Sequence, residues 1–119
     1  MSDIAKKTIA TTLEQTTRLN NIFVIRSNFD CLNRHRALIL HQSFVKLLLY
    51  SPNLCAIDMS KVSLVHSSAL THLINMHKVA QQWQCRLMFC HVQSSVKLVL
   101  EIAQLDQIIE IFDSWKDVV

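Results

Sequence analysis

The sequence predicts an α/β domain in which about four helices pack on a mixed, mostly parallel β-sheet of four to five strands. Short apolar or β-branched runs alternate with longer segments whose apolar residues recur every three to four positions. The chain has 119 residues, half of them hydrophobic, which suits one packed domain over 1–119. No apolar run approaches the roughly 18 residues of a membrane span, so we expect no membrane insertion.

The first half of the chain is predicted to contain two strands and a helix. Residues 8–14 are β-branched, and 22–26 form a second apolar run, which together indicate a β-hairpin. Apolar residues at helical spacing mark a helix over 34–50, with Asn33 as its N-cap. Pro52 ends this helix, because the residue before a proline is pushed out of the α region.

The second half alternates strands and helices. The run 54–59 is apolar except for Asp58, which indicates a central strand covered on both faces. Serines precede two helical patterns: Ser67 or Ser68 is expected near the N-cap of the first helix, and Ser94 or Ser95 is able to cap the second. The other elements are a loop over 60–67, a helix over 69–81, a strand over 86–92, a helix over 96–103, a strand over 108–112 and a closing helical turn over 113–118.

Polar residues gather where the predicted strands end. Asp30 follows the second strand, Asp58 ends the central strand, and the loop from Ser60 to Ser68 comes next. Parallel strands bring their carboxyl ends to one edge of the sheet, where ligands and partners usually bind. We interpret Asp58 and Ser60 as structural residues that bond the loop at the strand end. Asp30 is either a surface residue of this edge or a turn residue.

The chain contains no glycine. This excludes the Gly-rich phosphate loops of dinucleotide-binding and P-loop enzymes. Turns that require a positive φ must then use asparagine, aspartate or strained residues, and several asparagines are suitable candidates. The expected positions are Asn20, Asn21, Asn28, Asn33 and Asn53.

The charge distribution argues against nucleic-acid binding, and the spacing of histidines and cysteines argues against metal binding. The formal net charge is +3, but the basic residues are scattered and aromatics make up only 7%. His72 and His77 are five residues apart rather than four, and the neighbours Cys90 and His91 point to opposite faces of a strand. We therefore predict no metal, no cofactor and no nucleic-acid partner.

Four cysteines are present without C-x-x-C spacing. Cys55 and Cys90 lie within apolar runs, as buried thiols do. The N-terminus lacks the long apolar stretch of a secretory signal, and the polar residues 1–8 are expected to be loose. We interpret the cysteines as reduced thiols of a cytoplasmic protein.

Residues 56–70, AIDMSKVSLVHSSAL, resemble the signature of the STAS domain family. That signature has an apolar strand, then Asp-apolar-Ser, and then Asp-Ser-Ser-Gly-Leu at a helix start. Phe29 and Asp30 match the family's aromatic-plus-Asp after the second strand, and 95–105 resemble its third helix. The resemblance covers roughly residues 20–118 and implies the STAS fold.

The resemblance also implies a function. In the bacterial anti-sigma-factor antagonists of this family, the first serine of the motif is phosphorylated by a partner kinase. That kinase is an anti-sigma factor with a histidine-kinase-like ATPase fold, and a phosphatase reverses the modification. By position, Ser67 is the implied phosphoacceptor, and Asp30, His66, Ser67, Ser68 and Ala69 are the implied partner-binding residues. The implied protein is a monomer or weak dimer that binds partners in transcription signalling rather than an enzyme.

Two positions depart from the signature. His66 stands where the family has Asp, and Ala69 where it has Gly. A mostly neutral imidazole thus replaces a carboxylate, which leaves open whether Ser67 is a phosphoacceptor or only a helix cap. The alternative is a non-phosphorylated STAS scaffold subunit of a lipid-transport ATPase or stress-signalling complex. A Ser67–His66 hydrolase is disfavoured, because adjacent residues rarely place a base on its neighbour's hydroxyl.

Overall fold

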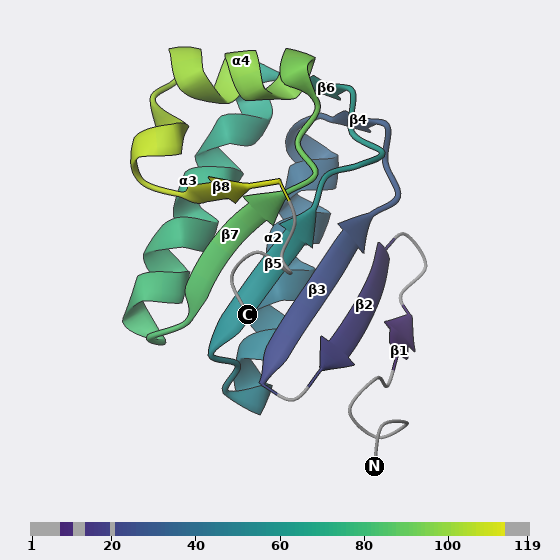
Figure 1. Cartoon of the computed structure of the whole chain (residues 1–119), viewed down its shortest axis with the longest axis vertical. Helices are drawn as coiled ribbons and strands as arrows, with labels where there is room; N and C mark the ends of the chain where they lie inside the picture. Colours follow the sequence, from purple (N-terminus) through teal and green to yellow (C-terminus); the bar gives the residue numbers. More distant parts are fainter. Residues whose placement is uncertain (1–7, 11–13, 20, 114–119) are drawn as a thin grey trace.

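A six-stranded sheet runs through the computed structural model, which describes residues 8–10, 14–19 and 21–113 (Figure 1). Its strands, in spatial order, are β1 (Thr8–Ala10), β2 (Glu14–Leu19), β3 (Ile22–Ser27), β5 (Leu54–Asp58), β7 (Arg86–Cys90) and β8 (Glu110–Phe112). The first three pair antiparallel, whereas β3, β5, β7 and β8 pair parallel. The predicted fold class is therefore confirmed, with six strands rather than four to five.

Two long helices cover one face of the sheet. Helices α2 (Arg34–Leu47) and α3 (Ser67–Gln82) lie behind β3, β5 and β7 in Figure 1. A third helix, α4 (Ser94–Ile102), lies at the end of the sheet to which the parallel strands point. Short 3-10 turns, η1 (Leu48–Tyr50) and η2 (Leu105–Gln107), follow α2 and α4. None of the described helices is both long and apolar enough to cross a membrane.

The central strand β5 is buried along its whole length, as its unbroken apolar pattern predicts. Cys55 and Ile57 face the helices and belong to the main core. Leu54 and Ala56 face the other side, where they form a smaller cluster with residues of β7. Burial on both faces fixes the register of this strand, because a shift by one residue would exchange the two sets of side chains.

The ends of α2 follow from its flanking residues. Asn33 is its N-cap, and the Asn33 side chain accepts a hydrogen bond from the Arg36 amide at 2.8 Å, as predicted. The predicted helix over 34–50 reaches Tyr50, but its last turn is the 3-10 helix η1. Ser51 then adopts a left-handed conformation with φ of 52°, and Pro52 follows. The chain thus leaves the helix at the predicted place.

Other boundaries differ from the prediction. The predicted strand over 8–14 contains β1 but only the first residue of β2, the strand that pairs with β3, because a polar, Thr-rich sequence gives no signal for where one strand ends. The described C-terminal strand begins at Glu110 rather than 108, and β7 ends at Cys90 rather than 92. The helices run over 67–82 and 94–102, against the predicted 69–81 and 96–103. The predicted closing turn over 113–118 lies outside the described residues beyond Asp113.

Positive φ angles occur at residues that were not predicted. Among the described residues they are found at Ser51, Gln84, His91 and Gln104, with φ between 52° and 62°. The predicted Asn21, Asn28, Asn33 and Asn53 do not adopt them, and Asn20 lies outside the described residues. Three of the four positions follow the ends of η1, α3 and α4, where glycine is usual. Helix termination, rather than residue preference, decides where the left-handed conformation is adopted.

We predict that Gln84→Gly stabilises the protein. Glycine adopts the left-handed conformation without the clash of a Cβ, so the free energy of unfolding should rise by up to about 1 kcal/mol. Urea unfolding followed by circular dichroism measures the change. The matched control is Gln81→Gly inside α3, which should lower the free energy of unfolding by about 1 kcal/mol. Equal destabilisation by both substitutions would contradict this account.

Two histidines meet between α2 and α3. The ring centroids of His41 and His72 are 6.4 Å apart, and the Nδ1 atom of His41 is buried without a hydrogen-bond partner among the described residues. Burial is the largest effect and lowers the pKa of His41. A hydrogen bond with the His72 backbone raises this pKa, and charge repulsion from His72 lowers it. His41 is therefore held neutral in the folded protein over a wider pH range than in the unfolded chain.

We predict that this pair makes the fold less stable in mild acid. Because the pKa of His41 is lowered on folding, the unfolded chain binds the proton more readily as pH falls below about 6.5. The free energy of unfolding should then fall between pH 7 and pH 5, and His41→Gln should reduce this fall. The control is His35→Gln, which removes an exposed histidine from the same helix and leaves His41 and His72 in place. Chemical denaturation at pH 7, 6 and 5 provides the comparison.

Candidate functional site

The described helices α2, α3 and α4 all begin at one end of the sheet, where the parallel strands end (Figure 1). We call this end the carboxyl edge; it comprises the segments 28–33, 59–66 and 91–93 and the first turn of each helix. None of the three helices has an acidic residue in its first turn. The positive ends of three helix dipoles therefore lie at this edge without a local carboxylate on the same turn.

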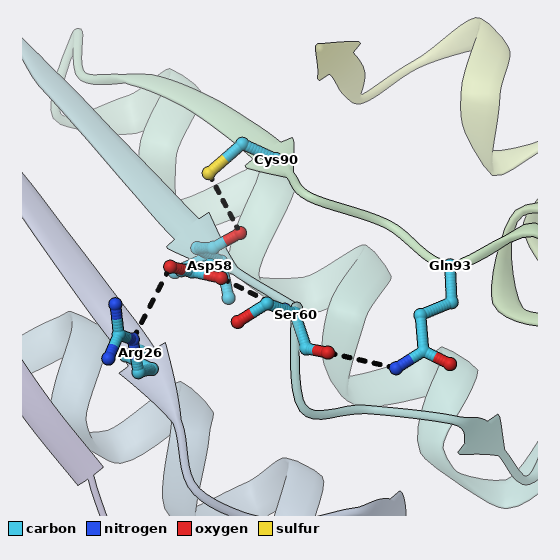
Figure 2. A network of polar contacts seen from close by, with 6 residues as sticks. Arg26, Asp58, Ser60, Cys90 and Gln93 are labelled. Atoms are coloured by element: carbon cyan, nitrogen blue, oxygen red, sulfur yellow. Dashed lines mark hydrogen bonds and ion pairs between the residues drawn. The ribbon is translucent and has the colours of Figure 1, made fainter. Parts of the chain in front are cut away.

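The Asp58 carboxylate anchors the loop that leaves β5. Its side chain is only 8% exposed. One oxygen, Oδ1, accepts a hydrogen bond from the Ser60 amide at 2.9 Å, and Oδ2 lies 3.4 Å from Nε of Arg26 on β3 (Figure 2). One oxygen of the Asp58 carboxylate thus contacts the loop, and the other contacts the neighbouring strand β3. Asp58 thus lies at the end of β5, and its carboxylate bonds the loop backbone.

Further bonds tie the same loop to β7 and α4. The Met59 amide donates to the Cys90 carbonyl at 2.9 Å. The Gln93 side chain donates to the Ser60 carbonyl at 2.8 Å, as Figure 2 shows. Sequence reasoning did not identify Gln93, because an exposed glutamine between a strand and a helix carries no signal of its own.

The loop is also tied to the segment before α2 by a two-stranded parallel pair, β4 (Cys31–Leu32) and β6 (Leu64–Val65). The Asp30 carbonyl accepts hydrogen bonds from the Ser63 amide at 2.8 Å and the Ser63 hydroxyl at 3.1 Å. The His66 amide donates to the Leu32 carbonyl at 2.9 Å. Strands of two residues are too short to be recognised from sequence. The pair places Asp30 and the start of α3 on one continuous backbone network.

Four of the five implied partner-binding residues are exposed. The Asp30 side chain is 86% exposed, and His66, Ser67 and Ser68 are exposed as well. We call these four residues the candidate surface. Ala69 is instead fully buried and belongs to the core, so its methyl group packs inward. An alanine side chain is small enough for this turn of α3 to pack closely against the sheet.

Ser67 lies directly beside the N-cap of α3, as expected, whereas neither Ser94 nor Ser95 is the N-cap of α4. The N-cap of α3 is His66, with no side-chain capping bond, and Ser67 is the first residue of the helix. The N-cap of α4 is Gln93 rather than Ser94 or Ser95. Ser95 instead donates its hydroxyl to the Ser63 carbonyl at 3.0 Å, which ties α4 to the loop. Ser67 is therefore an exposed residue of the first turn, and the N-cap position belongs to His66.

The described residues contain no candidate metal site, and two of their cysteines are neutral thiols. No group of three or more histidine, cysteine or acidic residues lies close enough to hold a metal ion in this part of the chain. All four cysteines are free. Burial raises the pKa of Cys85 to about 11 and that of Cys55 well above its usual value, so both are neutral thiols. A buried neutral thiol is a poor nucleophile.

Comparisons with known proteins agree on one family. The model of the STAS domain family matches residues 5–118. No curated protein sequence matches the chain. A putative anti-sigma factor antagonist from Thermotoga maritima superposes with a TM-score of 0.78 at 17% identity, covering 90% of this chain and 92% of that one.

Two further solved structures are similar. An anti-sigma-factor antagonist (STAS) domain protein from Planctomyces limnophilus gives a TM-score of 0.77 at 18% identity, covering 92% of this chain and 96% of that one. The phosphorylated form of the Bacillus cell fate determinant SpoIIAA gives a TM-score of 0.60 at 12% identity, covering 94% of this chain and 95% of that one. At such identities these structures show a shared fold.

We predict that the Asp58 carboxylate is a stability residue of the carboxyl edge. Asp58→Ala leaves the Ser60 amide without its acceptor and should lower the free energy of unfolding by about 1–3 kcal/mol. Asp58→Asn keeps an oxygen for that amide and should cost less. Thermal and urea unfolding of the two variants measure the difference. Equal losses would show that the charge on the carboxylate, rather than its hydrogen bond to Ser60, holds the loop.

Proposed function

This chain belongs to the STAS domain family, and we propose that it is a binding module of the anti-sigma-factor antagonist type, switched by phosphorylation of Ser67. Its partner is a serine kinase of the anti-sigma-factor class, and a phosphatase restores the unmodified state. The module acts by binding rather than by catalysis. The surface that carries this function is the candidate surface of Asp30, His66, Ser67 and Ser68.

The observation that carries the proposal is that Ser67 is exposed and is not the N-cap of α3. Its side chain is exposed at the first residue of α3, and the helix begins with His66 as its N-cap. A serine that capped the helix would use its hydroxyl oxygen for a backbone amide. Ser67 is instead an exposed residue within the first turn, with His66 at the N-cap position, and this leaves Ser67 at the surface where a kinase can reach it.

The site suits a phosphoryl group. A phosphate on Ser67 adds a charge of about −1.5 to −2 at the positive end of α3, which favours anions. The first turn of α3 contains no acidic residue that would repel it. The modification therefore leaves the helix in place and changes the charge of the candidate surface. A partner that fits the neutral surface must then desolvate or repel a phosphate, which weakens binding.

Structural neighbours support this reading. A phosphorylated form is known for SpoIIAA, and the Thermotoga maritima neighbour is described as a putative anti-sigma factor antagonist. His66 gives this chain an imidazole beside the phosphoacceptor where the family signature has a carboxylate. It removes one negative charge from the recognition loop, so we expect the kinase that acts on this chain to recognise the surface without that aspartate.

A matched set of variants tests the switch. The tagged wild-type chain, Ser67→Ala, Ser67→Glu and the control Ser68→Ala are expressed in the native host, and co-purified proteins are identified by mass spectrometry. We predict that wild type, Ser67→Ala and Ser68→Ala retain a common kinase-fold partner. Ser67→Glu should lose it by about tenfold or more, because a carboxylate adds negative charge to the surface.

The outcome separates the two functions. Retention of the same partner by Ser67→Glu and Ser67→Ala, with no phosphate found on Ser67 in the wild-type chain, would contradict the switch. That result would favour the scaffold function, in which the chain is a non-phosphorylated subunit of a larger bacterial assembly. Loss of the partner in Ser68→Ala as well would show that the start of α3 is a contact surface without a specific phosphoacceptor.

A further inference from the structure

Arg36 occupies a position that helix stability does not explain. It lies in the first turn of α2, where a positive side chain faces the positive end of the helix dipole. Arg34 is in the same turn and is exposed, and the turn contains no acidic residue. The Arg36 side chain is instead only 37% exposed, and its guanidinium group turns back toward the segment before the helix.

The guanidinium group contacts three consecutive residues. Its Nη1 atom donates to the Cys31 carbonyl at 3.1 Å. The same atom lies 3.6 Å from Oδ1 of Asp30. Its Cζ atom lies 4.8 Å from the centre of the Phe29 ring, within the range of a cation–π contact. One side chain thus contacts residues 29–31, and its planar guanidinium group combines the cation–π contact with a hydrogen bond in a fixed geometry that the compact ammonium group of lysine does not reproduce.

Backbone hydrogen bonds connect residues 29–31 and the adjoining Leu32 to the candidate surface. The Asp30 carbonyl accepts both hydrogen bonds of Ser63, and β4 pairs with β6. The Leu32 carbonyl then accepts from the amide of His66, the residue before Ser67. The contacts of Arg36 are therefore connected to the start of α3 through consecutive backbone bonds, without Arg36 being part of the candidate surface.

We propose that Arg36 is a positioning residue of the partner-binding surface. It holds residues 29–31 so that the exposed Asp30 carboxylate and the start of α3 form one fixed surface. This role rests on the proposed function, because it concerns the surface that the partner contacts. It concerns the geometry of that surface and is separate from the phosphorylation of Ser67.

Amide hydrogen exchange in the isolated chain tests the positioning without a partner. In Arg36→Gln the amides of Ser63 and His66 should exchange about five- to tenfold faster, because the Asp30 carbonyl lies in the segment that Arg36 holds and the Leu32 carbonyl directly follows it. The β5 amides should be unchanged, which excludes a general loss of stability. Arg34→Gln removes the same charge from the same helical turn and should leave all these amides unchanged. Arg36→Lys should not restore protection, because lysine lacks the planar group.

Binding provides the second measurement. Affinity for the kinase-fold partner that wild type retains should fall about fivefold or more in Arg36→Gln and Arg36→Lys, and stay unchanged in Arg34→Gln. Wild-type exchange of the Ser63 and His66 amides in Arg36→Gln would overturn the proposal. Faster exchange with undiminished partner affinity would also overturn it. Failure of the switch itself is seen separately, in the response to Ser67→Glu, since Arg36 is unaltered in that variant.

Discussion

The carboxyl edge depends on the carboxylate of Asp58, which is buried away from solvent at the end of the central strand β5. A charge as little exposed as that of Asp58 is costly unless it is paired and hydrogen-bonded. Arg26 on β3 supplies the opposite charge, and the Ser60 amide supplies the hydrogen bond. The loop after β5 is thereby fixed at its first residues. From there, Gln93 and Ser95 secure it to α4, and Ser63 secures it to the segment that contains Asp30.

This arrangement separates the stability of the edge from its exposed chemistry. The loops are held by backbone amides and carbonyls and by a few side chains, namely those of Asp58, Arg26, Ser63, Gln93 and Ser95, with Arg36 added by the proposal above. The side chains of His66, Ser67 and Ser68 are left at the surface. A modification of Ser67 can therefore change charge without breaking the bonds that shape the surface. Such a design fits a switch that acts through binding and leaves the fold intact.

Periodicity and the strand-end carboxylate were enough to predict the fold class, the central strand and the position of the edge. They depend on burial patterns that repeat over many residues, such as the unbroken apolar run of β5. The parts that were missed depend on single long-range contacts. The β4–β6 pair, the capping positions of His66 and Gln93, and the left-handed Gln84 follow from how distant segments meet. A resemblance in sequence indicated Ser67, but only the structure shows that the N-cap position belongs to His66.

The most direct test of this account is the modification state of Ser67 in the native host. The chain should be purified during growth and during stress, its intact mass measured, and any phosphate placed by peptide fragmentation. The account predicts a phosphate on Ser67 in one of these conditions, with a change in occupancy between them and none on Ser68. A chain that carries no phosphate on Ser67 in either condition would contradict the switch.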